Sequence, residues 1–249
     1  MTDLKTLVAT DSSIIAPKVL LYGVHGIGKS TFGSQCPKPV FLQTEDGLRG
    51  KNFKGVARLP ICKDWNDVKQ YMKMLIGEQH EYKTLVVDSI DWLQRLIFQD
   101  IAQDKGEEDI NDIGYSVGYR IASTRILTFL DLCSELHASK GMMICLLGHS
   151  NIVSFDPPDG NRYDRYSLDL HKWVAPLVFQ WSDLALFVNY KTRLRKAGDS
   201  FGKDIFKGIA GEAERIMYTE ERATHMAKNR YGLPYEMEFS WAALQKQLF

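Results

Sequence analysis

A glycine-rich stretch near the start of the chain carries residue types that bind phosphate. Gly23, Gly28, Lys29 and Ser30 fit the spacing G-x-x-x-x-G-K-[ST], and an apolar run, Val19 to Tyr22, leads directly into it. In such a loop backbone N–H groups wrap a phosphate chain, the lysine reaches the terminal phosphates, and the serine hydroxyl binds Mg²⁺. The pattern predicts a P-loop for ATP and Mg²⁺ made of Gly23, Val24, His25, Gly26, Ile27, Gly28, Lys29, Ser30 and Thr31. We expect His25 itself to be a solvent-facing loop residue.

Two further apolar runs end in acidic residues. Glu45 follows the run 40–44, and Asp88 ends the run 83–88. Open α/β sheets place ligands at the carboxyl ends of their strands. Asp88 is therefore predicted to bind Mg²⁺ together with Ser30, and Glu45 to orient or deprotonate the attacking water. An aspartate that only caps the next helix would give the same pattern at Asp88.

A polar residue ends another apolar run. The run 142–147 is continuous enough to be a strand buried on both faces, and His149 follows it. We expect this strand to end at the same sheet edge as the P-loop, where His149 could sense the terminal phosphate of ATP. The alternative is a structural histidine.

Residues 151–173 suggest contact with nucleic acid. They read as a long loop in which cationic and aromatic side chains alternate, a combination that holds single strands by phosphate contact and base stacking. Candidate contacts with single-stranded DNA are Arg162, Tyr163, Arg165, Tyr166 and Lys172. The alternative is a solvated loop whose tyrosines pack back on the protein. A second segment, 102–118, is acidic and glycine-punctuated, and is predicted to be a mobile surface loop.

Composition restricts the class of protein. The chain has 249 residues, with 31 basic and 31 acidic side chains and a formal net charge of zero. A neutral protein that binds DNA must use local patches or repeat itself along the strand. We expect no membrane segment, no secretory signal, four reduced cysteines and a cytoplasmic location.

The order of the apolar runs predicts an α/β fold. We expect a mostly parallel central sheet with helices on both faces, followed by an antiparallel C-terminal extension in residues 183–239 and a terminal helix capped by Ser240. Residues 1–17 are predicted to form an N-terminal arm, and residues 18–249 a single domain.

Taken in order, these motifs and the segment Lys228-Asn229-Arg230 resemble the core of RecA-type recombinases from about residue 18 to residue 240. The chain is most similar to the short phage-type RecA-like ATPases of the single-strand annealing group. The resemblance implies a RecA-like P-loop fold and an ATPase, stimulated by DNA, that acts on single-stranded DNA in recombination, annealing or repair. It also implies a phage-encoded protein in the host cytoplasm.

The resemblance also implies roles for individual residues. Glu45 would activate the hydrolytic water, and His149, where RecA has glutamine, would link the terminal phosphate to a DNA loop. Lys228 and Arg230 would reach across a subunit interface into the ATP site of a neighbour, which requires a homo-oligomer, either a ring or a filament. The two DNA loops would lie at about 102–118 and 150–172, and a single-strand-binding or annealing protein could be a further partner.

Other functions fit parts of the sequence. An AAA-type helicase loader or remodeller would need a helical lid after the core, whereas residues 183–239 read as strands. A P-loop kinase for nucleotides or other small molecules would act as a monomer and would not need Lys228 or Arg230 in trans. A scaffold could bind ATP without hydrolysing it.

Overall fold

The apolar runs form the strands of a central sheet. The structure, a computed structural model, describes residues 16–191, 194–200, 203–208 and 214–249, with side chains described outside 192–213. Residues 1–15 of the predicted N-terminal arm lie outside this description. Six strands pair in parallel in the order β7-β1-β5-β4-β2-β3. They are β1 (Lys18–Gly23), β2 (Pro39–Gln43), β3 (Ala57–Arg58), β4 (Thr84–Asp88), β5 (Met143–Phe155) and β7 (Leu184–Tyr190).

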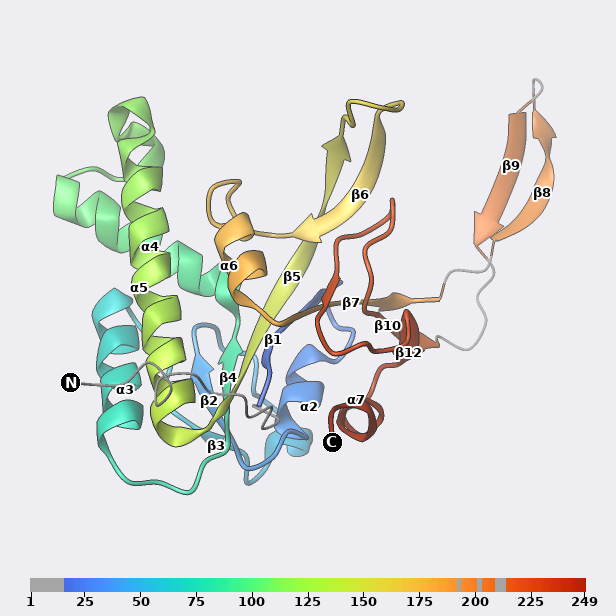
Figure 1. The fold of residues 1–249 in the computed structure, drawn as a ribbon. Helices are drawn as coiled ribbons and strands as arrows, with labels where there is room; N and C mark the ends of the chain where they lie inside the picture. Colours follow the sequence, from blue (N-terminus) through green and yellow to red (C-terminus); the bar gives the residue numbers. More distant parts are fainter. Residues whose placement is uncertain (1–15, 192–193, 201–202, 209–213) are drawn as a thin grey trace, which may run out of the picture.

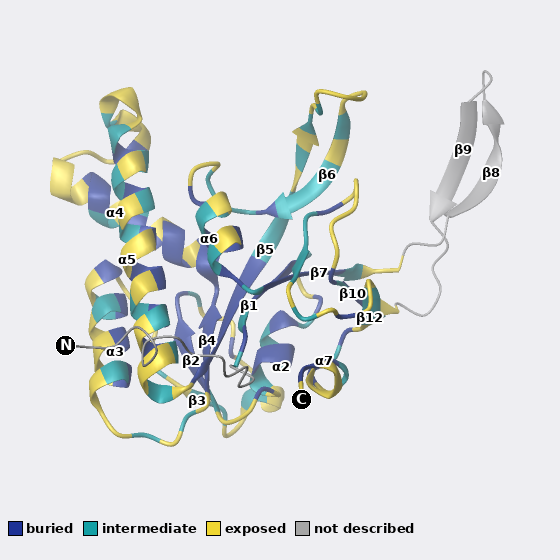
Figure 2. Ribbon diagram, in the orientation of Figure 1, coloured by how far each residue is buried: buried dark blue, intermediate teal, exposed yellow. Residues whose placement is uncertain are grey.

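Helices cover both faces of this sheet (Figure 1). One face carries α3 (Trp65–Gly77), α4 (Ile90–Lys105), α5 (Val117–Lys140) and α6 (Ala175–Trp181), and the other carries α2 (Lys29–Ser34) and α7 (Trp241–Leu248). Successive side chains of a strand point to opposite faces. Leu20 therefore belongs to the first of these two cores and Leu21 to the second. Buried residues are concentrated in the sheet and on the helix faces that cover it (Figure 2).

The C-terminal part of the sheet is antiparallel, as predicted. Strands β10 (Arg215–Tyr218) and β12 (Glu236–Glu238) extend the sheet beyond β7, and β11 (Lys228–Asn229) also pairs with β7. Strands β8 (Leu194–Ser200) and β9 (Lys203–Gly208) form a separate hairpin. The predicted extension starts one strand too early, because β7 is parallel to β1 and belongs to the core sheet. The predicted α/β architecture is otherwise confirmed.

The segment 102–118, predicted to be a mobile loop, contains helical structure over much of its length. Helix α4 continues to Lys105 and ends at Gly106 in the left-handed conformation, and two short 3₁₀ turns follow, η2 (Ile110–Asp112) and η3 (Gly114–Ser116). A capping box closes η2, and the side chain of Ile110 is buried. One buried apolar residue therefore fixes the segment despite its acidic composition.

The prediction of one long loop over residues 151–173 is also wrong, because strands occupy much of this segment. Strand β5 continues to Phe155 and pairs antiparallel with β6 (Tyr163–Leu168), which forms a two-stranded ribbon above the sheet. Helix α6, which has a proline in its first turn, was not predicted either. The ribbon resembles a loop in composition because its strands mix polar and apolar residues without regular alternation: Ile152 is 64% exposed, whereas Asn151 and Arg165 are half-buried. Within the described residues no helix has the length and apolar character needed to cross a membrane.

The start of α3 gives a test of the local structure. The carboxylate of Asp64 accepts hydrogen bonds from the backbone nitrogens of Asn66 and Asp67, at 2.8 and 2.9 Å. Loss of such an N-cap costs about 1 kcal/mol. We expect Asp64→Ala to lower the free energy of unfolding in urea by about that amount, and Asp64→Asn, which can still cap, to change it little. Equal losses in both variants would contradict the capping role.

Candidate functional site

The parallel register brings the predicted catalytic residues to one edge of the sheet. Gly23 lies opposite His149 across the β1–β5 ladder, and Asp88 lies opposite Leu147 across β4–β5. A cleft of about 270 Å³ opens at this edge. It is lined by Gly26, Gly28, Lys29, Ser30, Thr31, Glu45, Gly47, Phe53, Asp88 and His149. The structure thus brings together residues that the sequence predicted from four separate segments: Lys29 with Ser30, Glu45, Asp88 and His149.

Two P-loop glycines are required by the backbone itself. A Cβ atom on Gly23 would lie 2.2 Å from the carbonyl oxygen of Val188 on the neighbouring strand β7, closer than atoms can approach. Gly28 has a φ of 108°, in a region that other residues rarely adopt. The glycine pattern therefore reflects the close packing of strands as well as the shape of the phosphate loop.

Lys29 is almost fully buried at the base of the cleft. Its ammonium donates to the backbone carbonyls of Gly23 and Val24, at 3.1 Å each. Burial lowers the pKa of Lys29, and the nearby carboxylates of Asp88 and Asp91 oppose this effect. A cation held by carbonyls in a cleft of low dielectric is suited to binding the charge of a phosphate chain.

Asp88 and Ser30 fit a Mg²⁺ ion. Asp88 is 4% exposed, and its Oδ2 atom is buried without a hydrogen-bond partner. Burial raises the pKa of Asp88, which a hydrogen bond with Ser30 partly offsets. Mg²⁺ binds through one or two protein ligands, several waters and substrate phosphates, so this pair would suffice to hold it. When bound, the ion neutralises charge on the phosphates. No group of three or more His, Cys, Asp or Glu residues suited to another metal occurs among the described residues.

Glu45 is oriented by the strand next to its own. The hydroxyl of Ser89 donates to its Oε1 atom at 2.8 Å. Thr44 accepts a hydrogen bond from the Ser89 backbone nitrogen at 2.8 Å and donates to the Ser89 carbonyl at 2.7 Å. These bonds join the ends of β2 and β4 and aim the Glu45 carboxylate at the cleft. A carboxylate held in this way can accept a proton from water.

His149 is held by a buried carboxylate that the sequence analysis missed. Asp91, in the first turn of α4, accepts hydrogen bonds from the backbone nitrogen of His149 at 3.0 Å and from its Nδ1 atom at 2.9 Å. Burial would raise the pKa of Asp91, but these bonds and the charge of His149 outweigh it, and the net pKa is lowered. Because Nδ1 donates to Asp91, the Nε2 atom is the one left for the cleft. The only sequence signal was an acid three residues after Asp88.

The ring of His25 stacks on that of His149, with centroids 4.2 Å apart and planes 18° from parallel. His25 is exposed, as predicted, but it is not only a loop residue. It connects the phosphate loop directly to β5 at His149. The P-loop, β5 and α4 are thus joined through one histidine.

Comparison with known proteins shows the family to which the chain belongs. Residues 15–231 match a family described as an AAA domain, AAA_24, and this match covers most of the chain. The chain belongs to this AAA-domain family. Together with the P-loop and its strand order, membership identifies a P-loop ATPase with a RecA-like core, a class that binds nucleotide and typically uses Mg²⁺.

Two individual proteins are similar to this AAA-domain chain. The crystal structure of the RadB recombinase superposes with a TM-score of 0.52 and 10% sequence identity, covering 92% of this chain and 90% of that one, which shows a common fold. An uncharacterized protein derived from the SPbeta prophage of Bacillus subtilis (strain 168), YorG, is 28% identical over 98 residues. That match covers 38% of this chain and only 29% of the relative.

Lys228 and Arg230 lie away from the cleft of this AAA domain. Strand β11 pairs with the first residues of β7, at Leu184 and Ala185, whereas Gly23 pairs near its end, at Val188. The two cations therefore lie near the start of β7, whereas the P-loop of the same subunit lies near the end of that strand. A contact with ATP would have to be made with another subunit.

The two cations differ in their contacts. The ammonium of Lys228 donates to the carbonyls of Phe179, Gln180 and Ser182 at the end of α6, at 2.6 to 3.0 Å. An ammonium has three donors, so Lys228 is saturated within its own subunit. This structural role differs from the predicted trans contact. Arg230 pairs with Asp183 at 3.1 Å and keeps 58% of its side chain exposed, so it remains the candidate for a neighbouring site.

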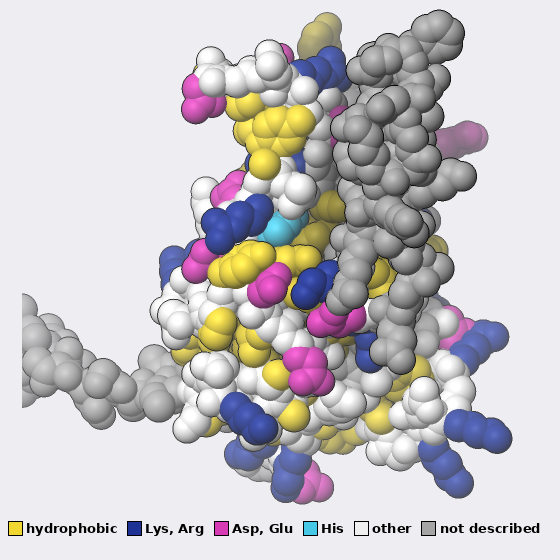
Figure 3. Space-filling model, turned by 90° about the vertical axis from the view of Figure 1, so that its right-hand side faces the viewer, with side chains coloured by type: hydrophobic (Ala, Val, Ile, Leu, Met, Phe, Trp, Pro, Cys, Tyr) yellow, Lys and Arg dark blue, Asp and Glu magenta, His cyan; other side chains and the backbone are white. Residues whose placement is uncertain are grey.

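The predicted DNA contacts divide into two groups. Arg162 and Lys172 are exposed, and Tyr163 is half-buried on the ribbon. The ring of Tyr166 packs 5.1 Å from that of Phe187, so Tyr166 faces the core and is not free to stack on a base. This is a correction to the prediction. Figure 3 shows hydrophobic and Lys or Arg side chains close together on the upper part of the molecule.

Arg165 is also less accessible than predicted. Its guanidinium lies 3.8 Å from the ring centroid of Phe155 and donates to Glu221 at 3.4 Å, with 15% of its side chain exposed. It therefore stiffens the ribbon and ties it to the segment before β11. Of the two arginines predicted to contact DNA, only Arg162 is exposed.

Arg215 of β10 is a second residue that sequence reasoning missed. Its Nη1 atom donates to the carbonyl of Ile27 in the P-loop at 3.0 Å, and a Cβ on Gly28 would lie 2.7 Å from it. Arg215 thus joins the C-terminal strands to the phosphate loop. No local pattern marks it, because the contact spans most of the chain.

The contacts of Lys228 predict a stability effect. Lys228→Met leaves three carbonyls without their charged donor, and we expect it to lower the free energy of unfolding by about 1–3 kcal/mol. Arg230→Ala removes an exposed ion pair and should cost less than about 1 kcal/mol. Urea denaturation of both variants measures the difference. Unchanged stability in Lys228→Met, with ATPase activity lost, would instead support a trans role for this lysine.

Proposed function

We propose that this protein is an oligomeric ATPase that acts on single-stranded DNA in recombination, annealing or repair. The observation that carries the proposal is the continuity of β5. This strand holds His149 in the ATP cleft and then continues without a break into the ribbon that carries Arg162 and Tyr163. One rigid element therefore connects the nucleotide with the candidate DNA surface.

In this proposal hydrolysis uses groups already in place. Lys29 and the P-loop backbone bind the phosphates, and the Glu45 carboxylate, oriented by Ser89, accepts the proton of the attacking water. His149, fixed by Asp91, contacts the terminal phosphate through Nε2. Ser30 and Asp88 would hold the Mg²⁺ ion. Loss of the terminal phosphate on hydrolysis would therefore remove its contact with His149 at the base of the ribbon.

Assembly completes the site in the same proposal. Arg230 of one subunit would enter the cleft of the next, as an arginine finger that stabilises charge in the transition state. Its exposure and its place at the far edge of the sheet support this role. A neutral subunit would bind DNA cumulatively, each copy adding a few phosphate contacts. We place it in the host cytoplasm as a phage-encoded protein, with a single-strand-binding or annealing protein as a possible partner.

An AAA-type helicase loader is less well supported. Such a protein needs a helical lid after its core, whereas the described residues beyond β7 form short strands and a single helix, α7. No feature of the cleft favours a small-molecule kinase or a non-hydrolysing scaffold.

The proposal predicts ATP hydrolysis that rises when single-stranded DNA is added. Lys29→Ala and Asp88→Asn should abolish it. Glu45→Gln should lower kcat by about 10²–10⁴-fold while ATP still binds, because only proton acceptance is lost. The ATPase rate is measured as phosphate release with and without an oligonucleotide. Light scattering measures the assembly state. If the protein is strictly monomeric and DNA does not change its ATPase rate, the result would favour a small-molecule kinase.

A mixing experiment tests the shared site. We expect Glu45→Ala and Arg230→Ala subunits each to be inactive in a pure assembly, whereas a mixed assembly contains some interfaces with both residues intact. We expect mixtures to recover part of the ATPase rate. If the mixture stays inactive although both variants fold and assemble, Arg230 does not act in trans.

A further inference from the structure

The exposed face of α4 presents a tryptophan beside a cation. Trp92 is 37% exposed, and the guanidinium of Arg95 lies 4.5 Å from the centroid of its ring. Arginine and aromatic planes are the surfaces on which nucleic-acid bases stack. No role for this pair follows from the ATP cleft, because neither residue lines it.

A second exposed tryptophan lies on the neighbouring loop between β6 and α6. Trp173 is 37% exposed, and Lys172 beside it is exposed as well. The loop is fixed in place: the backbone nitrogen of His171 donates to the side chain of Gln94 at 2.7 Å, and the His171 ring stacks on Tyr119 at 4.0 Å with planes 4° apart. The loop therefore docks on α4 at Gln94, the residue before Arg95.

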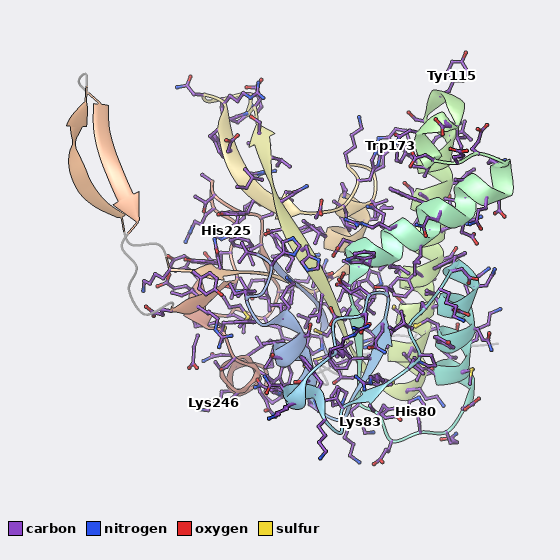
Figure 4. All side chains as sticks on the ribbon, turned by 180° about the vertical axis from the view of Figure 1, so that it is seen from behind. His80, Lys83, Tyr115, Trp173, His225 and Lys246 are labelled. Atoms are coloured by element: carbon purple, nitrogen blue, oxygen red, sulfur yellow. The ribbon has the colours of Figure 1, made fainter. Side chains whose placement is uncertain are left out.

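Both parts of this surface are connected to His149. Trp92 directly follows Asp91, which binds the His149 ring. On the other side, the backbone nitrogen of Asp169 donates to the carbonyl of His149 at 2.9 Å, and Asp169 accepts from Asn151 of the ribbon at 3.0 Å. In Figure 4 Trp173 lies between the β5–β6 ribbon and the tip of α4 and α5 that carries Tyr115.

We propose that Trp92, Arg95, Lys172 and Trp173 form a binding surface for single-stranded nucleic acid that continues from the ribbon. Bases would stack on the two indoles and the guanidinium, and phosphates would contact Lys172 and Arg95. Both charged residues of this surface are cations, which favours a polyanion, and Asp91 beside Trp92 is buried. The acidic segment 107–112 adjoins the loop through Tyr119, whose hydroxyl donates to Asn111, and marks the limit of the surface on that side. The inference rests on the proposed action on single-stranded DNA and assigns a site to it.

The test is the affinity for a fluorescent oligodeoxythymidylate, measured by anisotropy in the presence of ATP. One base–aromatic stack corresponds to about a 5- to 150-fold change in affinity. We expect Trp92→Ala and Trp173→Ala each to weaken binding within this range. Trp92→Phe, which keeps an aromatic plane, should recover most of the affinity. Arg95→Glu should weaken binding and reduce its salt dependence, because it reverses a cation that contacts phosphate.

Intrinsic fluorescence gives a second readout. The oligonucleotide should quench tryptophan emission in the wild-type protein, and the double Trp92→Phe, Trp173→Phe variant should lose that quenching. The other tryptophans, Trp65, Trp181 and Trp241, are buried or half-buried and would report little.

A matched control exists elsewhere on the chain. Tyr235 is 41% exposed and has the guanidinium of Arg222 at 4.6 Å, so it presents the same kind of pair away from α4. Tyr235→Ala should leave the affinity unchanged, and retained ATP binding shows that each variant is folded. If the wild-type protein does not bind the oligonucleotide, the proposed function itself fails. If it binds, and the tryptophan variants bind as tightly as Tyr235→Ala, this surface is not the site and a protein partner becomes its better occupant.

Discussion

The parallel pairing of β1 with β5 and β7 is the constraint on which the rest of the structure depends. It places the first P-loop glycine opposite His149 on one side and against the carbonyl of Val188 on the other, where no Cβ atom fits. Because β4 pairs with β5 in turn, Asp88 ends at the same edge. The strand order therefore determines where the ATP cleft lies. The helices on the two faces bury the strands that are paired in this order.

A single buried carboxylate extends this arrangement beyond the cleft. Asp91 binds both the backbone and the ring of His149, and leaving such a buried charge without its partner would cost about 3–5 kcal/mol. Helix α4 and the middle of β5, where His149 lies, are therefore expected to move together when the nucleotide changes. Both the ribbon and the aromatic surface on α4 start from these two residues, so the ATP state and nucleic-acid binding share one mechanical connection.

The sequence was sufficient for the parts of the site that lie at strand ends. Lys29 and Ser30 belong to the glycine-rich loop after the first apolar run, Glu45, Asp88 and His149 lie at or just after the ends of other runs, and the parallel fold brings these positions together. Asp91 and Arg215 could not be found in this way, because their importance depends on contacts between elements that are distant in sequence. The ribbon was mistaken for a loop, since its strands have a mixed composition. Lys228, in β11, matched a family motif. Its ammonium, however, lies at the end of α6, where it has three carbonyl partners that no local pattern predicts.

The most direct test of the connection is the affinity for single-stranded DNA measured with ATP and with ADP, in the wild-type protein and in Asp91→Asn. The asparagine keeps the shape of the side chain but removes the charge that fixes the Nδ1 hydrogen bond of His149. Coupling between two sites typically changes affinity by about 5- to 150-fold. The account predicts a ratio of this size between the two nucleotides in the wild type and a ratio near one in Asp91→Asn, with ATP still bound. An unchanged ratio in the variant would contradict it.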